Sequence, residues 1–183
     1  MSPTLIVILI IAVLVIIGIA VMIIRRRQRE RLQQHFGAEY ERQVEAAGGS
    51  KAKADAELLK REKRVEKLDI RPLPPAERDA FAEEWQKVQA RFVDDPERSI
   101  ALADALVAEV MKARGYPVQD FEQRAADISV DHPALVRNYR AAHEVAVRHS
   151  HGDAGTEDLR KALLGYRSLF DELLGTEQPE LAH

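Results

Sequence analysis

The chain has 183 residues, of which 46% are hydrophobic and 31% are charged, and its formal net charge is −3. It contains no cysteine, which excludes disulfides, thiolate nucleophiles and cysteine-ligated zinc sites. The charge is divided unevenly: residues 25–68 carry 13 Lys or Arg against 8 Asp or Glu, a net of +5, whereas residues 69–183 carry 14 against 22, a net of −8. An acidic C-terminal part disfavours nucleic acid as a partner.

The first predicted element is a transmembrane helix over residues 5–24, preceded by a short exterior N-terminus of residues 1–4. These 20 residues carry no charge, and 16 of them are Leu, Ile or Val. At about 1.5 Å of rise per residue, such a helix spans roughly 30 Å, which is the thickness of the bilayer hydrocarbon. No Ala-x-Ala cleavage site follows Ile24, so we expect the span to be retained and not to be removed as a signal peptide.

Five arginines follow the apolar stretch at once, and they predict the orientation of the chain. The positive-inside rule places them in the cytoplasm, so we expect a single-pass protein of the cell membrane with its N-terminus outside and its C-terminal domain cytoplasmic. The same cluster also suits contact with anionic lipids of the bilayer. These membrane-anchor flank residues are Arg25, Arg26, Arg27, Arg29 and Arg31.

Residues 25–68 predict a basic juxtamembrane helical stalk that is broken near residues 48–50. An apolar side chain recurs at every fourth position up to the break, at Leu32, Phe36, Tyr40 and Val44. After the break, residues 51–68 are rich in helix formers but contain few apolar positions. A coiled coil needs three or four apolar heptads, so we expect a solvated stalk, with self-association through it as the alternative.

Residues 69–175 predict an acidic bundle of four long helices and one short one, followed by a flexible tail of residues 176–183. Three prolines between residues 72 and 75 end the stalk and mark the domain boundary. Caps are expected at Asp95, Ser129–Pro133 and Thr156 for helix starts, and at Gly115 and Gly175 for helix ends. The predicted core positions are Phe81, Trp85, Val88, Phe92, Ile100, Ala103, Val107, Val110, Phe121 in the short segment 119–128, Leu135, Tyr139, Ala142, Ala146, Leu159, Leu163, Tyr166, Phe170 and Leu173. The predicted fold class is all-α.

Histidines are the first candidates for chemistry, and His143, His149 and His151 lie within nine residues. His143-Glu144 resembles the start of a His-Glu-x-x-His zinc motif, but Val147 stands where the second histidine is needed. We expect His143 to be a hydrogen-bonded packing residue, and an adventitious metal site at His149 and His151 is the weaker alternative. The acidic pairs at residues 83–84 and 94–95 are explained by a solvated helix face and a cap. The sequence therefore predicts no catalytic residue, no cofactor and no metal.

Three segments together resemble a family of bacterial single-pass membrane proteins with a C-terminal helical domain. They are FGAEYERQVE at Phe36–Glu45, the proline-rich run Ile70–Pro75, and the longest stretch, Val88–Pro133. The family has no assigned activity, so the resemblance implies architecture and no chemistry. The leading hypothesis is a membrane-anchored, non-enzymatic scaffold or adaptor with a protein partner, and the alternative is a membrane-tethered sensor that holds a small ligand in its helical module.

Overall fold

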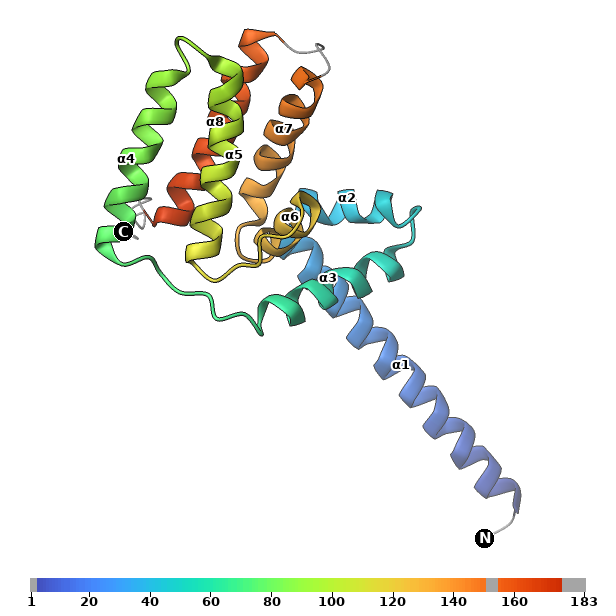
Figure 1. Cartoon of the computed structure of the whole chain (residues 1–183). Coiled ribbons are helices and arrows are strands. Elements are labelled where there is room, and N and C mark those ends of the chain that lie inside the picture. The colour runs from blue at the N-terminus through green and yellow to red at the C-terminus, as the bar shows by residue number, and fades with distance from the viewer. Residues whose placement is uncertain (1–2, 151–154, 176–183) are drawn as a thin grey trace, which may run out of the picture. The chain divides into compact units, whose positions relative to one another are not determined.

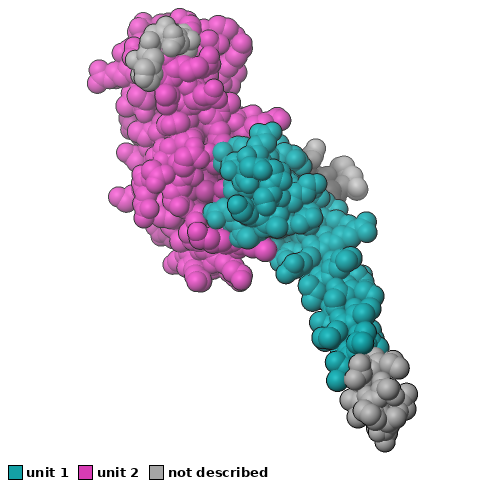
Figure 2. Space-filling model, turned by 90° about the vertical axis from the view of Figure 1, so that its right-hand side faces the viewer, with its two compact units in different colours: residues 1–58 teal, residues 59–183 magenta. Residues whose placement is uncertain are grey.

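The computed structural model describes residues 3–150 and 155–175, with the side chains of residues 10–149 and 155–175. Within these residues the protein is all-α, with eight helices and no strand, which confirms the predicted fold class (Figure 1). The chain divides into two compact units, residues 1–58 (unit 1) and 59–183 (unit 2), shown in Figure 2. The division lies inside a helix, ten residues ahead of the boundary predicted from the prolines.

Unit 1 begins with the longest helix, α1 (Pro3–Phe36). Every side chain from Ile10 to Gln28 is exposed, although those from Ile10 to Ile24 are uncharged and mostly large and apolar. Among the residues whose side chains are described, no helix combines the length and the apolar character needed to cross a membrane.

Two glycine turns shape the rest of unit 1. Gly37, which has a φ of 50°, separates the end of α1 from α2 (Ala38–Ala46). Gly48 and Gly49, with φ of 66° and 81°, then lead into α3 (Lys51–Val65). Glycine adopts positive φ without a steric penalty, which explains both turns. The second was predicted; the first breaks the helix that the apolar spacing predicted to continue to Val44.

The segment predicted to be a solvated stalk contains a small buried core. The side chains of Leu32, Phe36 and Tyr40, and of Ala54 and Leu58 on α3, are at most 1% exposed. The Tyr40 hydroxyl donates a hydrogen bond of 2.9 Å to Asp55, which joins α2 to α3. The apolar stripe of the stalk is therefore buried from Leu32 to Tyr40 and is not solvated as predicted.

Unit 2 is a helical bundle, as predicted, with four long helices and one short one among its described residues after the proline-rich segment. They are α4 (Pro75–Arg91), α5 (Pro96–Ala113), α6 (Phe121–Asp131), α7 (Pro133–Ser150) and α8 (Thr156–Leu174). Trp85 is 4% exposed and stacks on Phe170 with 4.6 Å between ring centroids, which confirms its assignment to the core. Of the predicted core positions, Phe81, Phe92, Phe121, Leu135, Ala146 and Leu163 are half-buried and the others are buried.

Side chains and glycines define most helix ends of the bundle. The Asp95 carboxylate accepts a hydrogen bond from the Arg98 amide at 3.0 Å, which confirms the predicted cap of α5. Ser129 lies inside α6, and α7 begins at Pro133 directly after His132. Thr156 is the first residue of α8 and Gly155 is the residue before the helix, so the predicted Thr156 cap is wrong. The turn at residues 151–154 and the tail 176–183 lie outside the described residues.

Gly115 closes α5 in a position that only glycine can occupy. The Gly115 amide donates to the Lys112 carbonyl and the Tyr116 amide donates to the Met111 carbonyl, which together form a Schellman motif. Gly115 has a φ of +99°, and a Cβ there would lie 2.3 Å from the Asp69 carbonyl oxygen. The Arg71 amide donates to the Arg114 carbonyl at 2.9 Å. The proline-rich segment is thus held against the end of α5 through backbone contacts.

Candidate functional site

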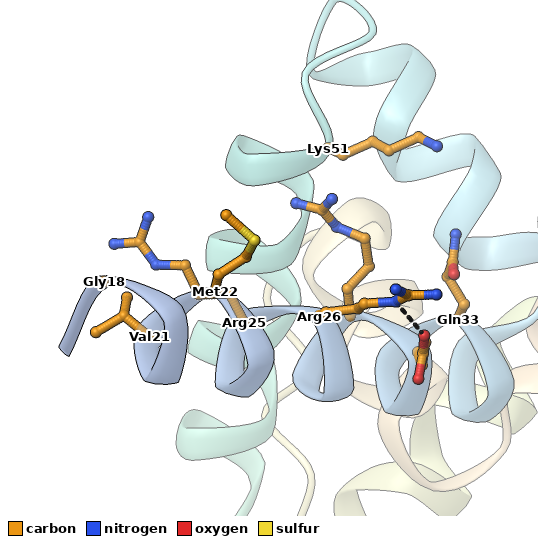
Figure 3. A pocket seen from close by; sticks show the side chains of 9 residues that line it. Gly18, Val21, Met22, Arg25, Arg26, Gln33 and Lys51 are labelled. Atoms are coloured by element: carbon orange, nitrogen blue, oxygen red, sulfur yellow. Dashed lines mark hydrogen bonds and ion pairs between the residues drawn. The ribbon is translucent and has the colours of Figure 1, made fainter. Parts of the chain in front are cut away.

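A basic groove of about 660 Å³ lies in unit 1, along one face of α1. Its α1 residues follow the spacing of a helix face, because positions three, four, seven and eight residues apart lie on the same side. Lys51, the first residue of α3, completes the groove, and Figure 3 shows its side chain across the groove from α1, pointing away from Arg25. The lining residues are Gly18, Val21, Met22, Arg25, Arg26, Arg29, Glu30, Gln33 and Lys51.

Four cations and one carboxylate line this groove, a net of +3. Arg26 forms an exposed ion pair of 3.1 Å with Glu30. Arg29 donates to Asp55 at 2.9 Å, and that hydrogen bond is the main reason why the pKa of Arg29 is raised. Arg25 and Lys51 have no ion-pair partner among the residues that the structure describes. The groove therefore presents two uncompensated charges next to two partly compensated ones.

Asp55 links the three helices of unit 1 behind the groove. It accepts from Arg29 on α1 and from the Tyr40 hydroxyl on α2, each at 2.9 Å. Burial, reinforced by the hydrogen bond to Asp55, raises the pKa of Tyr40 to about 12, so this hydroxyl stays protonated and remains a donor at neutral pH. These bonds position α3, and with it Lys51, relative to the arginines.

The structure divides the five arginines that the sequence singled out. Arg25, Arg26 and Arg29 line the groove, whereas Arg27 and Arg31 are exposed and are not among its lining residues. Lys51 was missed, because it is 22 residues beyond Arg29 and comes near it only through the folding of α3 onto α1. The signal available in the sequence was Gly48-Gly49, a pair typical of a sharp turn.

Comparisons with known proteins do not identify a family or a function for this chain. No protein-family model, curated protein or solved structure matches this chain. The resemblance to bacterial single-pass membrane proteins stays a prediction, and the sites are argued from their own residues.

A second groove, of about 490 Å³, lies in unit 2 between α7 and α8. Its floor is made of small residues, among them Ala142 and Gly165, and a Cβ on Gly165 would lie 2.8 Å from the Asn138 carbonyl oxygen. Leu164 lines the same groove and is 48% exposed. The close approach of the two helices leaves a shallow, partly apolar surface at which an outside side chain can pack. The other lining residues are Ala141, Val145, Arg148, Asp158, Lys161, Ala162 and Ser168.

The histidines do not converge on a site within the described residues. His143 is half-buried and stacks on Phe121 with 3.6 Å between centroids and 7° between the rings. It packs as predicted, but through this stack, because the His143 side chain has no hydrogen bond among the described residues. Burial lowers its pKa. His149 lies 3.5 Å from Glu97, and His151 lies outside the described residues. No group of three metal-ligating side chains occurs in the described part of the chain.

Two buried or half-buried ion pairs in unit 2 were not predicted from the sequence. Asp127 is fully buried and accepts from Arg64 Nε at 2.7 Å and from Gln123 at 3.0 Å. Arg124 pairs with Asp104 at 3.1 Å. Each carboxylate is matched by a cation from a different helix, as buried charges require. These contacts hold the helices together, and no cavity opens onto Asp127 or Arg124 among the grooves described above.

Proposed function

We propose that the chain is a membrane-anchored, non-enzymatic scaffold or adaptor whose helical bundle binds a protein partner at the cytoplasmic membrane surface. The main support for the proposal is that the exposed apolar side chains are concentrated in the first part of α1. Of 16 exposed large hydrophobic residues in the described part of the chain, 12 lie between Ile10 and Ile24, and the other four are Val93, Leu102, Val147 and Leu164. Such a continuous apolar surface is typical of a segment with a lipid environment.

The proposed span is Leu5–Ile24, whose first five side chains lie outside the described set. Sixteen Leu, Ile or Val side chains at roughly −0.3 to −0.6 kcal/mol each favour insertion by about 5 to 10 kcal/mol. The arginines begin directly after Ile24, which supports a cytoplasmic position for the C-terminal units under the positive-inside rule. Anchoring confines the bundle to a plane, which raises its effective concentration for a partner on the same membrane.

The groove between α7 and α8 is the proposed partner surface. It combines an exposed leucine, small residues and charged side chains at its margin, such as Arg148, Asp158 and Lys161. An apolar centre with a polar rim is the usual arrangement of a protein interface. The net charge of −8 over residues 69–183 favours a partner with a basic surface.

Two measurements test the anchor. The full-length protein should stay in the pellet when membranes are washed at alkaline pH, because a spanning helix is not held by charge. A reporter fused after His183 that is active only in the cytoplasm should be active. Release by the wash would refute the anchor. An inactive cytoplasmic reporter, together with activity of a reporter that works only outside the membrane and is fused at the same position, would reverse the orientation.

A photo-crosslinking amino acid tests the partner surface. We expect one reproducible protein adduct in cells when the probe replaces Leu164 in the groove. Leu102 on α5 is also exposed, at 37%, and is not a groove residue, so the same probe there is the matched control. Equal adducts from both positions, or none from Leu164, would remove the support for this surface.

The alternative function is a ligand-binding module. The α7–α8 groove has the volume of small-molecule sites, which run from about 300 to 1,000 Å³. A small amphiphile that copurifies with the full-length protein and is displaced by Leu164→Trp would favour this function over the adaptor.

A further inference from the structure

We infer that the basic groove of unit 1 is a binding site for the phosphate headgroup of an anionic phospholipid. The inference deepens the proposed function and rests on its membrane anchor, since it names the lipid chemistry that the anchored protein selects. It is narrower than a general attraction of arginines to acidic membranes, because it assigns the binding to one face of α1 and to Lys51.

The groove has the composition of a lipid site. Its apolar part comes from Val21 and Met22, and its charged part begins one turn later at Arg25. An anionic lipid has the same order, with acyl chains next to a phosphate. Val21 and Arg25 are four residues apart, which is about 6 Å along a helix, so one lipid can contact both.

Charge is concentrated on this face and is not balanced there. Arg25 and Lys51 lack an ion-pair partner among the described residues, and Arg26 and Arg29 each have only one carboxylate. Figure 3 shows these two side chains pointing in opposite directions, so they supply free cations from two different helices at separate points of the groove, and a lipid phosphate can be bound at either point. Lys51 also opens α3, so the positive end of that helix dipole adds to the same field.

The position of Lys51 is fixed by the fold of unit 1. Asp55, one turn along α3, accepts hydrogen bonds from Arg29 and Tyr40. Asp55 therefore holds the first turn of α3 at Arg29 before any ligand arrives. A site whose cations are held in place loses less entropy on binding than free side chains do.

The remaining cations of the segment provide a matched control. Arg27 is exposed, lies two residues from Arg25 and does not line the groove. Lys53 is exposed, lies two residues from Lys51 and does not line it either. The pair Arg25→Gln/Lys51→Gln and the pair Arg27→Gln/Lys53→Gln remove equal charge at nearly equal depth, and they differ in the face that they alter.

Native mass spectrometry of the full-length protein in detergent, with equal amounts of phosphatidylglycerol and phosphatidylcholine, measures the preference. At about fivefold per cation near a membrane surface, the Arg25/Lys51 variant should lose roughly 25-fold of the preference for phosphatidylglycerol. The Arg27/Lys53 variant should keep the preference of the unmodified protein, because neither residue lines the groove. Equal losses in the two variants would show diffuse attraction and would overturn the site.

Two further measurements distinguish a lipid headgroup site from a site for a free anion and from a failure of the membrane anchor. Inorganic phosphate in place of lipid should compete only weakly; competition as strong as that of phosphatidylglycerol would assign the groove to a free anion. The alkaline wash tests the anchor on its own. A protein that resists the wash but shows no lipid preference refutes the headgroup site alone, whereas a protein that the wash releases refutes the anchor first.

Discussion

Gly115 gives the sharpest prediction about the bundle. Replacing it with alanine forces an L side chain into a φ of +99° and puts a Cβ 2.3 Å from the Asp69 carbonyl oxygen. The strained backbone costs about 1–3 kcal/mol. The steric clash adds about 1–3 kcal/mol, because Asp69 must move as backbone. We therefore expect Gly115→Ala to lower the free energy of unfolding of unit 2 by about 2–5 kcal/mol.

Gly175 provides the control for the steric part of this loss. It also follows a helix and has a positive φ, of +70°, but nothing lies within 4 Å of a Cβ built there. Gly175→Ala should cost only the conformational penalty of the left-handed region, about 1–2 kcal/mol. The difference between the two variants isolates the packing of Asp69 against the end of α5.

Urea unfolding of the full-length protein in detergent, followed by the fluorescence of Trp85, measures both variants. Trp85 is the sole tryptophan and stacks on Phe170, so its signal reports the core of the bundle. At an m-value of about 1–3 kcal/mol per molar, a loss of about 3 kcal/mol moves the midpoint by roughly 1–3 M. If the two variants unfold at the same midpoint, the argument from the Asp69 contact is refuted.

Three further predictions concern caps and charges in unit 2. Arg64→Gln leaves the buried Asp127 carboxylate without its cation, and because Arg64 is 31% exposed we expect a loss near the lower end of about 3–5 kcal/mol in urea unfolding. Asp95→Ala should cost about 1 kcal/mol by removing the cap of α5, whereas Asp94→Ala, at an exposed neighbour with no such bond, should be near neutral in the same assay. Burial lowers the pKa of His143 below its ordinary value of 6.5. As the pH falls, His143 is therefore protonated in the unfolded chain before it is protonated in the folded chain, and the free energy of unfolding decreases. The pH dependence of unfolding between about pH 7.5 and 5.5 should be flatter in His143→Gln, and an unchanged slope would contradict that role.

The bundle was predictable from the sequence because its signals are local. Trp85 and Phe170 belong to stripes with the helical period, and Asp95-Pro96 carries the chemistry of a helix start. Gly115 follows a helix and precedes a proline by two residues, which is typical of a helix end. None of these inferences depends on knowing which other segment lies nearby.

Unit 1 was predicted less well, because its folding depends on contacts between helices. A glycine inside a helix lowers helix stability by only about 1 kcal/mol relative to alanine. Gly37 alone was therefore not enough to predict that the helix breaks between Leu32 and Tyr40. The bond from Arg29 to Asp55 joins residues 26 positions apart. No spacing rule pairs such residues, and so the cation that Lys51 adds to the groove came only from the structure.

Because α1 is one continuous helix, a tilt of its apolar part also moves its C-terminal end. Phe36 lies 12 residues beyond Ile24, which is about 18 Å in a helix, and Asp55 is bonded to Arg29 partway along that length. With α1 in a bilayer, a change of lipid thickness alters helix tilt, and a change of about 10° would swing the Phe36 end by roughly 3 Å. That displacement would carry α3 along, so in the proposed anchored state the thickness of the membrane would act on the folded part of unit 1.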